Sequence, residues 1–130
     1  MTEQYWLTPS ELYRRLDDRH HFTFDPCPYP LPPDFNGLKM EWGESNFVNP
    51  PTRKTDCYAG SGPTAFVRKA IHEREEHGRK SVILLPVPSY VNLLTEAGAK
   101  LLPLGRVQWL EVDTREPLRA AYHVCGFILE

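Results

Sequence analysis

The residues whose types and spacing are best suited to catalysis are Asn49-Pro50-Pro51-Thr52, which follow the apolar pair Phe47-Val48. Proline lacks a backbone N–H and has a fixed φ, so a strand ends there, and the residue before it is extended. The Asn49 amide carbonyl and the Pro50 carbonyl are then placed to accept hydrogen bonds from one amino group. Two acceptors on an aromatic –NH2 favour a pyramidal nitrogen with an available lone pair. The alternative is a proline-ended strand that turns into a surface loop.

A second candidate segment begins at Asp25, directly after Phe22-Thr23-Phe24, whose alternation predicts a strand. Five of the eight residues from 26 to 33 are proline, which excludes regular structure there. The segment is therefore a stiff loop at the carboxyl end of a strand, where open α/β sheets bind ligands. Asp25 either accepts hydrogen bonds from a ligand ammonium or hydroxyl, or closes the loop as an Asx-turn.

The first helix is predicted to begin at Thr8-Pro9-Ser10-Glu11, which reads as a capping box with Thr8 as the N-cap. Leu12 and Leu16 are spaced to face a core. The aromatic pair Tyr5-Trp6 precedes this helix and either packs over its start or contacts a ligand. Trp42 is likewise either a core residue or a stacking platform.

The rest of the chain predicts alternating strands and helices. A helix begins at Pro63 and ends at Gly78, with Glu73 to Glu76 in its solvated face. The apolar run from Ser81 to Pro86 is typical of a strand buried on both faces of a parallel sheet. The remaining segments predict a short strand or extended segment over 38–42, a strand over 46–48, a short helix over 91–97, and strands over 104–112 and 120–129 that pair as a hairpin.

Length and composition indicate one domain over residues 1–130, with no segment left for a separate target-recognition domain. The net charge of −2 gives no global attraction to nucleic acid, so any such binding depends on local patches. Three widely spaced cysteines favour neither a disulfide framework nor a metal site. With no signal peptide and no long apolar span, we expect a cytoplasmic protein without a membrane partner.

Several short motifs occur in one order along almost the whole chain. Together they resemble the phage-type DNA adenine (N6) methyltransferase family, which depends on S-adenosylmethionine. The motifs are Trp6-Leu7-Thr8-Pro9, Phe24-Asp25-Pro26-Cys27, Gly37-Leu38 followed by Trp42, Asn49-Pro50-Pro51, Lys69-Ala70, Leu85-Pro86 and Gly105-Arg106.

This resemblance implies an α/β, Rossmann-like methyltransferase fold with a mostly parallel sheet and an antiparallel pair formed by the last two strands. It implies methyl transfer to the amino group of a flipped adenine in DNA, with no metal. The catalytic residues would be Asn49, Pro50, Pro51 and Thr52. The residues that bind S-adenosylmethionine would be Trp6, Thr8, Pro9, Asp25, Pro26, Cys27 and Trp42. The family also implies a phage or prophage origin.

The chain departs from the family at Thr52, where the family has an aromatic residue that stacks on the base. Tyr58, Tyr90 and Trp109 are candidates for that role. The alternative function is a non-catalytic, methyltransferase-like module that binds nucleic acid or protein. The basic pairs that would then contact phosphates, or otherwise act as solubilising surface charge, are Arg53-Lys54, Arg68-Lys69 and Arg79-Lys80. Target specificity would come from the segment 53–62 or from homo-oligomerisation.

Overall fold

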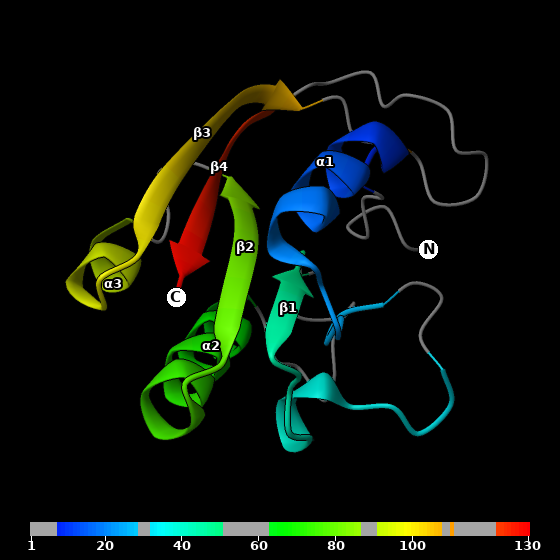
Figure 1. Ribbon diagram of the computed structural model, residues 1–130, viewed down its shortest axis with the longest axis vertical. Helices are drawn as coiled ribbons and strands as arrows, with labels where there is room; N and C mark the ends of the chain where they lie inside the picture. The colour runs from blue at the N-terminus through cyan, green and yellow to red at the C-terminus, as the bar shows by residue number, and fades with distance from the viewer. Residues whose placement is uncertain (1–7, 29–31, 51–62, 87–90, 108–109, 111–121) are drawn as a thin grey trace.

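The computed structural model describes residues 8–28, 32–50, 63–86, 91–107, 110 and 122–130. Its regular elements, in chain order, are α1 (Ser10–His20), the short 3-10 helix η1 (Gly37–Lys39), β1 (Ser45–Val48), α2 (Pro63–His77), β2 (Lys80–Pro86), α3 (Val91–Glu96), β3 (Lys100–Val107) and β4 (Tyr122–Leu129) (Figure 1). The expected α/β class is confirmed.

The four strands form one mixed sheet in the order β1-β2-β4-β3. β1 and β2 are parallel, whereas β4 is antiparallel to both β2 and β3. The expected antiparallel pairing of the last two strands is confirmed, but a mostly parallel sheet is not, because β4 lies between β2 and β3. Pro103 cannot donate to a ladder, which suits β3 to the edge, while Phe127 and Ile128 bring apolar side chains to both faces of β4.

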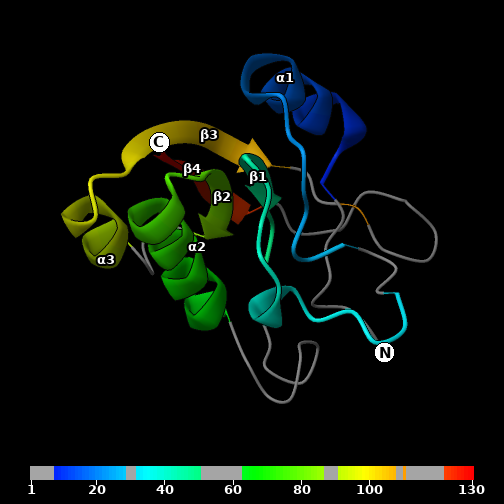
Figure 2. The same ribbon diagram turned by 60° about the horizontal axis from the view of Figure 1, so that its bottom comes forward.

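Helices cover both faces of the sheet, with α1 on one face and α2 and α3 on the other (Figure 2). Alternate residues of β2 serve the two cores: Val82 and Leu84 pack toward α1, and Ile83 and Leu85 pack toward α2. All four are at most 2% exposed. This confirms the prediction of a strand buried on both faces.

Several element boundaries differ from the expectation. The N-cap position of α1 is Pro9 and no side chain caps the helix, so the predicted capping box at Thr8 is wrong. The Phe22–Phe24 segment is not a full strand, since only Phe24 forms a parallel bridge, to Asn46. Residues 38–42 contain the end of η1 and no strand. β3 begins at Lys100 and ends at Val107, earlier than the expected span of 104–112.

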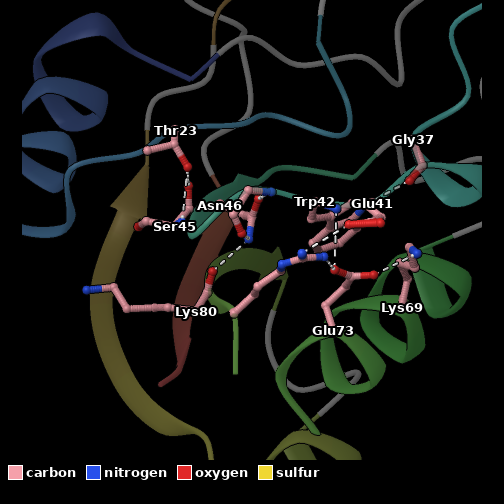
Figure 3. A network of polar contacts seen from close by, with 11 residues as sticks. Thr23, Gly37, Glu41, Trp42, Ser45, Asn46, Lys69, Glu73 and Lys80 are labelled. Atoms are coloured by element: carbon pink, nitrogen blue, oxygen red, sulfur yellow. Dashed lines mark hydrogen bonds and ion pairs between the residues drawn. The ribbon is translucent and has the colours of Figure 1, made fainter. Parts of the chain in front are cut away.

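Glu73 on α2 is buried, with 1% of its surface exposed, although the sequence predicted it in a solvated face. It shares the buried stripe of the helix with Phe66 and Ala70, at helical spacing of four and then three residues. Its carboxylate accepts hydrogen bonds from Lys69 Nζ at 2.9 Å and Arg79 Nη1 at 2.8 Å, and from the Trp42 backbone N–H at 3.3 Å (Figure 3). These three donors compensate for burying the charge.

The Glu73 ion pairs make the stability of the protein sensitive to acid. Burial by itself would raise the pKa of Glu73, but the hydrogen bonds from Lys69, Arg79 and Trp42 outweigh it and lower the pKa from 4.5 to about 2. A carboxyl with a lowered folded-state pKa contributes stability above its unfolded pKa and loses it as the pH falls. The contribution is about 3 kcal/mol, lost between about pH 4.5 and 2.

We therefore expect Glu73→Gln to lower the free energy of unfolding at pH 7 by about 2–3 kcal/mol, because two cations lose their common partner. The variant should also show a flatter pH dependence below pH 4.5. Urea unfolding at pH 2.5, 3.5, 5 and 7 measures both effects. Glu76→Gln, an exposed position on the same helix, is the matched control and should change neither. Equal pH profiles for Glu73→Gln and wild type would contradict the role given to this carboxylate.

Candidate functional site

The start of α1 and the end of β1 meet at the Asn49 side chain. Asn49 Nδ2 donates to Thr8 Oγ1 at 3.2 Å, so two motifs that are 41 residues apart are in direct contact. Thr8 thus does not cap the helix that follows it, and its hydroxyl accepts from Asn49. Pro50, the next residue, is buried.

The Asp25 turn lies beside the end of β1. Phe24 bridges Asn46 in parallel, and the Phe47 N–H donates to the Phe24 carbonyl at 3.0 Å. The two segments therefore run in the same direction. Asp25 and Asn49 each come after one of them, so both lie where the parallel segments end. Asp25 Oδ1 accepts from the Cys27 N–H at 2.8 Å, which is the Asx-turn considered from the sequence.

Gly37 and Trp42 pack behind this turn. A Cβ at Gly37 would overlap the backbone of Pro26, so only glycine allows this close approach. Trp42 Nε1 donates to the Gly37 carbonyl at 2.8 Å, and the Trp42 side chain is 4% exposed (Figure 3). Cys27 belongs to the same apolar cluster as Trp42. Of the two roles considered for Trp42, the structure places it in the core.

Two polar residues of β1 hold the strand that carries Asn49, and the sequence did not single them out. Asn46 is fully buried; its amide accepts from Gly43 N–H at 2.8 Å and donates to the Gly43 and Lys80 carbonyls at 2.9 Å each (Figure 3). Ser45 Oγ donates to the His20 carbonyl at 2.7 Å, joining the end of α1 to the start of β1. The signal that could have found them is two polar residues inside a short buried strand.

The Asp25 carboxylate has an unusual electrostatic setting. Burial raises its pKa from 3.8 to about 6, against the Cys27 hydrogen bond, which lowers it. No lysine, arginine or histidine in the described ranges forms an ion pair with it. Tyr13 of α1 lies close enough for its own pKa to be raised by burial and by the charges of Asp17 and Asp25. A partly buried carboxylate without a cation is suited to a ligand that brings positive charge or hydroxyl donors.

The remaining predicted site residues fall into two groups. Pro9 lies at the start of α1, and Pro26 is buried in the Asp25 turn. Trp6, Pro51 and Thr52 lie outside the described residues, as do the proposed stacking candidates and the pair Arg53-Lys54. Lys69 and Arg79, considered as phosphate contacts, both pair with Glu73.

Comparison of this chain with protein-family models, curated proteins and solved structures finds no match.

The part of the chain that the structure describes contains neither a metal-binding cluster nor a membrane-spanning helix. There, His, Cys, Asp and Glu side chains do not gather in any group of three or more that would hold a metal ion. None of the helices described is both long and apolar enough to cross a bilayer.

The raised pKa of Asp25 predicts a loss of stability with rising pH. The folded protein holds this proton more tightly than the unfolded chain, so the contribution is present below pH 3.8 and disappears as the pH passes about 6. Its size is at most about 3 kcal/mol, because the side chain is only partly buried. Asp25→Asn keeps the oxygen that accepts from Cys27 and should abolish this decline. Unfolding measured at intervals from pH 4 to 7 tests it, with the exposed Asp18→Asn as control; an unchanged decline in Asp25→Asn contradicts it.

The contact between Gly37 and Pro26 predicts that Gly37→Ala displaces the Asp25 turn. Backbone atoms cannot move aside as a flexible side chain does, and overpacking of this kind costs about 1–3 kcal/mol. The pKa of Asp25, followed by NMR titration of the carboxyl carbon, should then fall toward its ordinary value as water enters. Gly78→Ala is the control: its φ of 68° makes alanine unfavourable, but an added Cβ has no neighbour within 4 Å. It should lower stability without moving the Asp25 pKa, and a Gly37→Ala protein with an unchanged pKa would exclude this coupling.

Proposed function

We propose that this chain transfers a methyl group from S-adenosylmethionine to the exocyclic amino group of adenine in DNA. The observation that carries the proposal is the contact of Asn49 with Thr8 beside the Asp25 turn, at the end of two segments that run in parallel. Three motifs that are separate in the sequence thereby form one site. The ends of parallel strands are also where open α/β sheets bind their ligands.

A Rossmann-like methyltransferase fold is part of this proposal. It is supported by the common direction of β1, β2 and β3, with β4 reversed between the last two. Helices on both faces of the sheet are consistent with it (Figure 2).

The cofactor side of the site would consist of Thr8, Pro9 and the Asp25–Cys27 turn. When bound, S-adenosylmethionine supplies a methyl group that its sulfonium already activates. Asp25 fits such a ligand, because its carboxylate lacks a cationic partner among the described residues and is costly to ionise where it lies. A cationic or hydroxyl-bearing ligand would stabilise the ionised carboxylate. The buried Cys27 and Pro26 would form an apolar wall beside it.

The acceptor side would consist of Asn49 and Pro50. With its amide nitrogen bound to the Thr8 hydroxyl, Asn49 contributes its amide carbonyl, and Pro50 contributes its backbone carbonyl. Both oxygens accept from the adenine amino group and make its lone pair available. This interaction strengthens as the nitrogen becomes tetrahedral, so it lowers the barrier more than it tightens binding. The adenine has to leave its base stack to reach the site.

A pair of variants separates the two halves of the site. Asn49→Ala should reduce turnover by about 10²–10³ and change the affinity for S-adenosylmethionine little, because Asn49 serves the acceptor. Asp25→Asn should weaken cofactor binding by about ten- to a hundred-fold, the contribution of a charge-assisted hydrogen bond. Calorimetry with the cofactor and transfer of labelled methyl groups to DNA of mixed sequence measure the two effects.

Thr8→Val, which keeps the shape of the side chain and replaces the hydroxyl with a methyl group, is the control for the orientation of Asn49. It should lower turnover less than Asn49→Ala does. Wild-type turnover in Asn49→Ala would contradict the mechanism. Wild-type protein that binds S-adenosylmethionine and methylates no DNA would overturn the proposed reaction and favour the non-catalytic module.

A further inference from the structure

A cavity of about 650 Å³ lies between α1 and the strands β3 and β4, and none of the residues that line it belongs to the Asn49 site. In Figure 2 α1 lies above the sheet on this side, and α2 and α3 lie below it. The described residues that line the cavity are Leu12, Arg15, Leu16, Arg19, His20, Lys100, Leu101, Leu102, Leu104, Ile128 and Glu130. Its volume is in the range of small-molecule sites.

The floor of the cavity is aliphatic. Leu12 and Leu16 from the helix face Leu102, Leu104 and Ile128 from the sheet, and the three sheet residues are only partly buried. None of the described lining residues is Phe, Tyr or Trp, and the ring among them is the imidazole of His20. This favours a ligand other than a nucleobase, since bases are commonly held by stacking on large aromatic side chains. A flexible aliphatic chain matches this floor better.

The rim of the cavity is cationic although the chain as a whole has a net charge of −2. Arg15 and Arg19 are one helical turn apart, exposed, and in no ion pair with the described residues. Lys100 lies across from them on β3 and pairs with Glu130 at 3.0 Å. Two guanidinium groups at this spacing suit the oxygens of a carboxylate or phosphate.

His20 adds an independent observation. It is 7% exposed and lines the cavity, and neither of its ring nitrogens has a hydrogen-bond partner in the described structure. Buried polar atoms are normally paired, so this ring lacks the partner that its position calls for. Burial, Lys80 and Arg19 lower the pKa of His20, which favours the neutral ring, and a neutral imidazole has one N–H to donate.

We infer that this cavity binds a small amphiphile with one aliphatic chain and an anionic head, either a carboxylate or a phosphate monoester. The chain lies on the leucine and isoleucine floor, and the head lies between Arg15, Arg19 and His20. The inference does not depend on methyl transfer, because the cavity and the Asn49 site share no residue.

Calorimetry on the full chain with sodium decanoate, kept below the concentration at which it forms micelles, tests the inference. One molecule should bind saturably, and the affinity should rise from hexanoate to decanoate by up to about fourfold per methylene group. The uncharged decanol should bind at least tenfold more weakly than decanoate. The ring-nitrogen NMR signals of His20 should shift on binding, whereas those of the exposed His72 should not.

The double variant Arg15→Gln, Arg19→Gln should weaken decanoate binding by about ten- to a hundred-fold. Both side chains are exposed, so we expect the variant to fold like wild type. Arg14→Gln, also exposed on α1 but outside the cavity, is the matched control and should bind like wild type. Binding to phosphatidylglycerol vesicles is measured separately.

Binding to the vesicles but not to monomeric decanoate would show that the cavity is not the site. The inference would also be overturned if decanoate does not bind, if decanol binds with equal affinity, or if the double variant binds decanoate like wild type.

Discussion

The arrangement of this molecule depends on the hydrogen bonds and ion pairs of the buried Glu73 carboxylate. It joins α2 to the Trp42 backbone and to Arg79, the residue before β2. Trp42 in turn holds the Gly37 carbonyl, and Gly37 lies against Pro26 next to Asp25. A charge removed from water needs all of its partners in place, so the network tolerates little displacement. The network therefore reaches from α2 to the Asp25 turn, whose Cys27 packs in the same core cluster as that helix.

The Asn49 site illustrates how local stiffness and tertiary contact combine. Two prolines end β1 without any help from the rest of the chain, and buried polar bonds from Asn46 and Ser45 then position that strand. Thr8 orients the Asn49 amide from a third segment. A mechanism that depends on acceptor geometry requires this kind of preorganisation, since groups already in place need no reorganisation during the reaction.

α1 has different environments at its two ends. Thr8, just before its start, contacts Asn49, and the helix itself borders an aliphatic cavity with a cationic rim from Leu12 to His20. The hydrogen bond from Ser45 to the His20 carbonyl ties the second end to the start of β1. One helix therefore connects the proposed catalytic site to the proposed amphiphile site.

The sequence by itself determined the elements whose signals are local. Proline predicts the end of β1, Gly78 predicts the end of α2, and the apolar run from Ser81 predicts β2. Each of these signals acts on the backbone of a few neighbouring residues, so it does not depend on the rest of the fold. Tertiary structure decided the rest. The burial of Glu73 depended on donors from Lys69, Arg79 and Trp42, of which two lie outside its helix, and the role of Thr8 depended on Asn49, 41 residues away. The position of β4 inside the sheet likewise depends on its pairing with β2, which lies far from it in the chain, and local patterns do not encode such a pairing.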